Sequence, residues 1–90
     1  MPDKKVQYID SLTDKLRVTR SDLCRMLGVG TTMISYYVKG ERKPASSTVR
    51  ASVMLDLLQD HGLVEAYLDK CDELGLETEL KGLTYGNRRK

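Results

Sequence analysis

The chain has 90 residues, of which 40% are hydrophobic and 31% charged, and its formal net charge is +2. These values suit one small globular domain with a modest core. No apolar run approaches the length of a membrane-spanning helix, and the N-terminus lacks the apolar segment of a signal peptide, so we expect a cytoplasmic protein with no membrane contact.

The first third of the chain predicts two helices. Apolar side chains recur at spacings of three and four through residues 4–17, which indicates a first helix that faces the core. Thr19 then offers an N-cap, and Asp22 stands where the acid of a capping box would be. We expect a second helix over residues 20–27, ended by Gly28 in a left-handed conformation.

A third short helix follows the second almost at once. We expect it over residues 31–39, with Thr31 or Thr32 as its cap and Gly40 as its end. Two short helices joined by a few residues that include glycine are typical of a helix-turn-helix motif. The side chains expected to be buried on the third helix are Ile34, Tyr37 and Val38.

The second half of the chain predicts two more helices and a tail. Ser46, Ser47 or Thr48 can cap a fourth helix that runs to about Asp60, and a fifth covers residues 63–74. The fourth has a broad apolar face: Val49, Ala51, Val53, Met54, Leu55, Leu57 and Leu58. The fifth carries a wide apolar stripe: Leu63, Val64, Tyr67, Leu68, Cys71 and Leu74. Two readings of that stripe stay open, a cover for the core or a contact with a second subunit.

We divide the chain into a domain over residues 1–75 and a C-terminal tail over residues 76–90. The tail has scattered leucines and glycines and a basic end. A flexible terminus is the simplest reading, and an arm for dimerisation or for contact with DNA is the alternative.

Charge is unevenly distributed along the chain. Basic side chains dominate residues 17–50, acidic side chains dominate residues 51–80, and the last ten residues are basic again. Such an asymmetry orients an approaching polyanion toward the basic part of the molecule. It favours a protein that binds nucleic acid through the segment that contains the predicted helix-turn-helix.

The segment from Leu23 to Pro44 resembles the phage repressor and Cro family of helix-turn-helix proteins, which includes lambda repressor. The resemblance rests on leucine and glycine at 27 and 28, Val29, Ile34 and Tyr37, and on the run KGERKP that follows. Cys24 stands where the family usually has alanine, because the two helices approach closely there. The resemblance implies an all-α, five-helix bundle with the helix-turn-helix at its second and third helices.

The same resemblance implies where DNA would be contacted. The recognition helix would lie in the major groove of double-stranded DNA, where threonine, serine and tyrosine can contact base edges. Basic side chains nearby would hold phosphates and set the register. The residues implied for base reading are Thr31, Thr32, Ser35 and Tyr36, and those implied for phosphate anchoring are Arg20, Lys39, Arg42 and Lys43.

No catalytic, cofactor-binding or metal-binding pattern stands out, so we expect neither an enzyme nor a cofactor. Cys24 and Cys71 lie far apart with no His or Cys beside them, which predicts two buried thiols. The expected function is that of a small phage-type repressor, a homodimer that occludes a promoter in a bacterium or a phage-infected host cell. Two alternatives remain: a DNA-binding antitoxin that holds a protein partner through its fourth and fifth helices, and a phage accessory or DNA-packaging protein.

Overall fold

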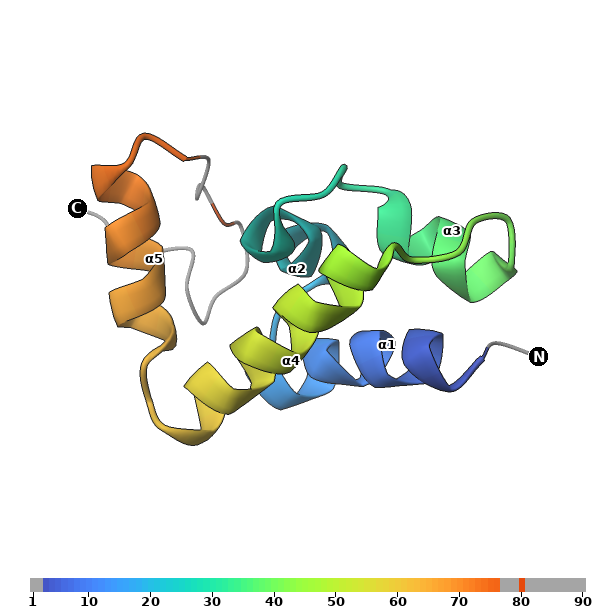
Figure 1. The fold of residues 1–90 in the computed structure, drawn as a ribbon, viewed down its shortest axis with the longest axis horizontal. Helices are drawn as coiled ribbons and strands as arrows, with labels where there is room; N and C mark the ends of the chain where they lie inside the picture. Colours follow the sequence, from blue (N-terminus) through green and yellow to red (C-terminus); the bar gives the residue numbers. More distant parts are fainter. Residues whose placement is uncertain (1–2, 77–79, 81–90) are drawn as a thin grey trace.

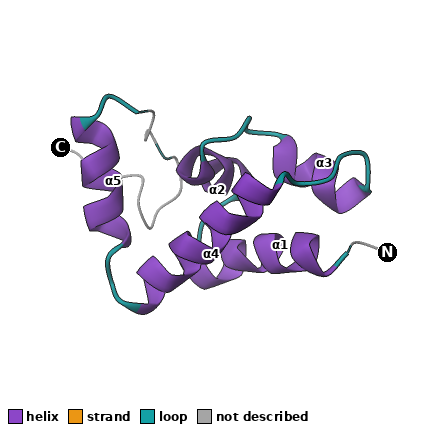
Figure 2. Ribbon diagram, in the orientation of Figure 1, coloured by secondary structure: helices purple, strands orange, loops and turns teal. Residues whose placement is uncertain are grey.

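A computed structural model describes residues 3–76 and Leu80. All regular secondary structure in this part of the chain is helical (Figures 1 and 2). The five helices are α1 (Lys4–Leu16), α2 (Arg20–Leu27), α3 (Met33–Lys39), α4 (Ser46–Asp60) and α5 (Val64–Glu73). The predicted all-α class and the five helices are therefore confirmed.

Both ends of α2 and the C-terminal end of α3 follow from local sequence. The Thr19 hydroxyl accepts a hydrogen bond from the Asp22 amide at 3.1 Å, so the predicted N-cap of α2 is present. Gly28 ends α2 with φ 80°, as predicted, and Gly40 ends α3 in the same way with φ 79°. Both positions lie in the left-handed region, which glycine enters without steric cost.

Two predicted side-chain caps do not form. Thr32 is the N-cap residue of α3, as predicted, but its side chain makes no capping bond. The Met33 amide donates to the Gly30 carbonyl in a tight turn just before the helix. The residue before α4 is Ala45, which also makes no side-chain cap. Ser46 is already helical, and its hydroxyl accepts from Arg50 Nε at 3.2 Å instead.

The core lies where α1, α2, α3 and α4 meet. α1 packs against α2, α3 and α4, and α5 joins through α4 (Figure 1). The apolar stripe predicted for α1 is buried, which explains the regular spacing in the sequence. The fully buried apolar side chains of this core include Ile9, Leu12, Leu16, Leu23, Ile34 and Leu68.

The apolar face predicted for α4 is buried only in part. The buried side chains of this helix are Thr48, Ser52 and Leu55, and two of these are polar. The Ser52 hydroxyl is satisfied by the Thr48 carbonyl at 2.9 Å. Val53, Met54 and Leu57 point out of the core and are 42%, 59% and 54% exposed. The apolar side chains of α4 itself occur on more than one side of the helix. The sequence of the helix therefore did not identify which side faces the core.

The stripe predicted for α5 also divides. Val64, Leu68 and Cys71 are buried against the core, so this part of the stripe covers it. Leu63 and Leu74, at the two ends of the helix, are exposed. Cys24 and Cys71 are both buried thiols, as predicted.

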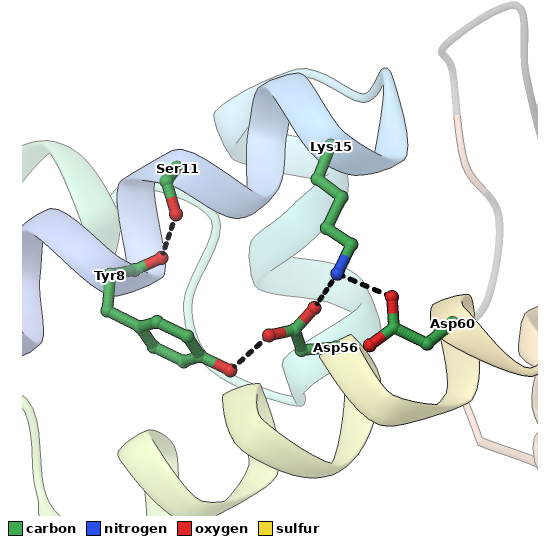
Figure 3. A network of polar contacts seen from close by, with 5 residues as sticks. All are labelled: Tyr8, Ser11, Lys15, Asp56 and Asp60. Carbon is green, nitrogen blue, oxygen red and sulfur yellow. Dashed lines mark hydrogen bonds and ion pairs between the residues drawn. The ribbon is translucent and has the colours of Figure 1, made fainter.

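A polar network ties α1 to α4 on the surface (Figure 3). The Tyr8 hydroxyl donates to Asp56 at 2.6 Å, and the Lys15 ammonium bonds both Asp56 and Asp60. Burial and the Asp56 hydrogen bond raise the pKa of Tyr8 to about 12. The hydrogen bonds from Lys15 and Tyr8 lower the pKa of Asp56. The network fixes the relative orientation of two helices that are far apart in sequence.

Within residues 3–76, no helix combines the length and the apolar character needed to cross a bilayer. The predicted tail lies largely outside the described residues. Of its members that are described, Leu76 is exposed and Leu80 is buried against the core. The proposed role of the basic end as an arm lies outside the described residues.

Candidate functional site

The site is built on α2, the connection over residues 28–32, and α3. Cys24 is fully buried where the two helices meet, and the backbone amides of Ile34 and Met33 reach its thiol. Burial raises the pKa of Cys24, which those amides only partly oppose. A larger side chain at position 24 would separate the helices, because the first turn of α3 lies directly against it.

α3 has two distinct sides. Ile34 and Tyr37 are 1% and 3% exposed and hold the helix on the core. Ser35 and Tyr36 are half-buried on the other side. Both threonines implied as base readers, Thr31 and Thr32, precede the helix in the turn and are exposed. The structure thus brings these four candidate readers together at the start and on the outer side of α3.

Tyr36 and Arg42 form one unit at the end of α3. The chain reverses at Gly40, and the backbone amide of Glu41 donates to the Tyr36 carbonyl at 2.9 Å. This reversal brings the Arg42 guanidinium over the Tyr36 ring, 5.5 Å from its centroid. A cation at this distance is attracted by the aromatic face. A predicted base reader and a predicted phosphate anchor therefore contact each other directly.

Exposed cations follow Tyr36 along the chain. Lys39, Arg42 and Lys43 are all exposed, and only Glu41 brings a negative charge into the same loop. None of the three cations forms an ion pair with the acidic side chains of the described residues. Acidic α5 lies at the other end of the long axis of the molecule (Figure 1). The charge asymmetry seen in the sequence is thus also an asymmetry in space.

Arg20 differs from the other predicted anchors because it already has a partner. Its Nε and Nη2 atoms donate to the two carboxylate oxygens of Asp10 at 2.9 and 3.2 Å. This bidentate pair joins the start of α2 to α1, and it raises the pKa of Arg20. Arg20 can reach a phosphate only by leaving or sharing Asp10. Ten residues separate the two side chains, so no helical spacing pointed to the pair.

A second ion pair lies inside α2. Asp22 is fully buried, and Arg25 Nη1 donates to it at 3.0 Å. The two residues are three apart on one helix, a spacing at which side chains meet, so this pair could have been found in the sequence. Asp22 thus does more than stand near a helix N-terminus. It fixes Arg25 beside the α2–α3 connection.

A cavity of about 590 Å³ lies between the end of α2, the α2–α3 connection and α5. Its walls are mostly apolar, and Tyr67 and Cys71 of α5 contribute to them. The Tyr67 hydroxyl donates to the Met26 carbonyl at 2.5 Å. Burial, together with nearby Cys71, raises the pKa of Tyr67 to about 12. In the described part of the chain, no cluster of His, Cys, Asp and Glu side chains could hold a metal ion.

No protein-family model, curated protein or solved structure matches this chain.

Proposed function

We propose that this chain is a sequence-specific, double-stranded DNA-binding transcription regulator in which α2 and α3 form a helix-turn-helix. The observation that carries the proposal is the outer side of α3. Ser35 and Tyr36 lie there, and three exposed cations that form no ion pair within the described residues follow at its C-terminal end. A helix held on the core by Ile34 and Tyr37 is a rigid platform for such contacts. The resemblance to the phage repressor and Cro family supports the same assignment.

In this proposal α3 enters the major groove. Thr31 and Thr32 meet base edges first, because they stand at the N-terminal end of the helix. Ser35 and Tyr36 read further along the groove. Hydroxyl groups can donate to or accept from several bases, so each contact discriminates modestly and the site is read by their sum.

Phosphate contacts hold the helix in register. Lys39 and Lys43 supply exposed point charges, and Arg42 supplies a guanidinium oriented by the Tyr36 ring. Arg20 adds an anchor from α2 when its bond to Asp10 is exchanged for a phosphate. These contacts provide affinity and salt dependence without reading sequence.

The regulator acts as a homodimer on two half-sites about one helical turn apart, the usual geometry for this motif. The five helices leave no room for a separate effector domain in the described residues. Occlusion of a promoter by the bound dimer is then sufficient for repression.

Selection of bound fragments from a random duplex pool, followed by footprinting of the DNA upstream of this protein's own gene, tests the proposal. Competitor duplex in excess removes non-specific binding. We expect an enriched motif with two spaced half-sites, lost in Tyr36→Ala. Lys39→Ala should weaken binding to all sequences. Lys70→Ala is the matched control, since Lys70 is an exposed lysine on distant α5.

Two outcomes would count against the proposal. One is that no motif is enriched over the starting pool. The other is that Lys70→Ala weakens binding as much as Lys39→Ala, because the phosphate contact would then not be centred on α3.

The antitoxin hypothesis is the second candidate, and the surface of α5 is the observation that favours it. Glu65, Asp69 and Glu73 are exposed on this helix, and the exposed leucines 74 and 76 follow it. An acidic surface with apolar side chains suits a basic protein partner. Co-purification of a small basic protein with the tagged chain from its natural host would support this role. A large ring-shaped oligomer in solution would instead favour a packaging protein.

A further inference from the structure

α4 presents three large apolar side chains to solvent, whereas two of its three buried side chains are small and polar. With about 100° of turn per residue, Val53, Met54 and Leu57 lie within about 100° of arc on one side of the helix. The buried side chains lie on the opposite side: Thr48, Ser52 and Leu55. An exposed patch of large apolar side chains marks an interaction site more often than a solvated surface. We call these three exposed residues the outer face of α4.

We propose that the outer face of α4 is where two copies of this chain associate, with the two α4 helices antiparallel about a two-fold axis. The charges at the ends of the face argue for a second copy. Arg50 lies on the N-terminal side of the apolar residues and Asp60 on the C-terminal side. In an antiparallel two-fold contact, the N-terminal end of one α4 lies against the C-terminal end of the partner's α4, so opposite charges face each other.

The register of this contact follows from the numbering. When residue i meets residue 110 − i of the partner, Val53 meets Leu57 and Arg50 meets Asp60, each twice across the axis. Met54 lies one residue from the axis, so both copies of it fill the centre. Asp60 remains half exposed although it also bonds Lys15 (Figure 3). It can therefore accept a second cation.

The same register fits the spacing of paired DNA sites. Ser46, the first residue of α4, lies nine residues from the axis, or about 13.5 Å along the helix, so the two copies of Ser46 are about 27 Å apart. In each copy, residues 40–45 connect the N-terminal end of α4 to α3, so α3 lies further from the two-fold axis than Ser46 does. The separation of the two α3 helices is therefore of the order of one turn of DNA.

The contact is small, because it involves one helix face from each copy. An interface below the standard size gives weak, concentration-dependent association. The dimer then forms mainly at high protein concentration or on a paired DNA site. Only the role of the dimer in binding paired DNA sites rests on the proposed function. Self-association through α4 is measured without DNA, so the dimer contact and the DNA-binding function can fail separately.

A charge exchange in sedimentation equilibrium tests the geometry, over a range of about 10 µM to 1 mM protein suited to a weak contact. R50E alone and D60K alone each set like charges against each other twice, and each should weaken self-association about tenfold or more. An equimolar mixture of R50E and D60K restores both opposite-charge pairs, in one hetero-pair. We expect the mixture to associate within about threefold of the unmodified chain.

Apolar controls accompany the charge exchange. L57E should abolish self-association, whereas L74E should leave it unchanged because Leu74 is an exposed leucine just after the C-terminal end of α5. Circular dichroism of each variant separates loss of contact from loss of fold. The proposal is overturned if the unmodified chain stays monomeric across the range, or if mixing R50E with D60K restores nothing. Equal effects of L57E and L74E would also overturn it, by showing association through another surface.

Discussion

The Tyr67 hydroxyl donates to the Met26 carbonyl at 2.5 Å and so connects α5 to the last turn of α2. The last carbonyls of a helix have no partner within it, and this one is satisfied by a side chain 41 residues away. Two residues later the chain turns toward α3. The position of the α2–α3 connection thus depends on α5, although α5 is distant from α3 in the fold (Figure 1).

Tyr67→Phe should destabilise the chain by about 1 kcal/mol, because it removes one hydrogen bond and leaves the carbonyl of buried Met26 without its donor. Urea unfolding monitored by circular dichroism measures the change. Tyr36→Phe is the control, and it should alter stability by no more than about 0.5 kcal/mol. Identical midpoints for the Tyr67 variant and the unmodified chain would show that the contact contributes nothing to stability.

Tyr8→Phe should destabilise the chain at neutral pH, and the deficit should shrink as pH rises. The pKa of Tyr8 is raised from 10.0 to about 12 by burial and by Asp56, so the folded chain keeps a proton that the unfolded chain has lost. Stability from this group is therefore complete below pH 10 and is lost between pH 10 and 12.

The expected deficit below pH 10 is about 1 kcal/mol, because Tyr8 is partly exposed. Other groups titrate in the same range, including Tyr67, so the comparison must be between the variant and the unmodified chain at each pH. Urea unfolding at several pH values provides it. A deficit that stays constant through this range would mean that Tyr8 does not hold its proton more tightly when folded.

Asp10→Asn should strengthen binding to DNA, because it releases Arg20 from a bidentate carboxylate. Arg20→Ala should weaken binding and reduce the slope of log K against log salt by about one. Fluorescence anisotropy over a salt series measures both. If Arg20 only joins α1 to α2, both variants will lose stability and neither will change the slope.

Tyr36 offers two groups that substitutions can separate. Tyr36→Phe removes the hydroxyl and keeps the ring under Arg42, so preference for the selected motif should fall by about 1 kcal/mol while non-specific binding stays the same. Tyr36→Ala should also weaken non-specific binding, since Arg42 loses its support. Competition with motif and random duplexes measures both effects. Equal behaviour of the two variants would assign the whole contribution to the hydroxyl and none to the ring.

The sequence by itself determined the helices and most of their ends. The apolar spacing of α1, the Thr19 cap and the glycines at 28 and 40 act over a few residues, so their geometry depends little on the rest of the chain. Thr32 takes the predicted N-cap position of α3, but its side chain makes no capping hydrogen bond. The candidate readers Ser35 and Tyr36 were implied by the family resemblance, and the structure places both on the side of α3 opposite buried Ile34 and Tyr37.

Only the tertiary structure decided which face of α4 is buried, which acid holds Arg20 and that Leu80 joins the core. It also brought Arg42 over Tyr36 and Tyr67 to Met26. The physical reason is common to most of these. α4 is apolar on several sides, so its orientation is set by the shape of the surrounding helices. The partners of Arg20 and Tyr67 come from other helices, and periodicity within one helix contains no information about them.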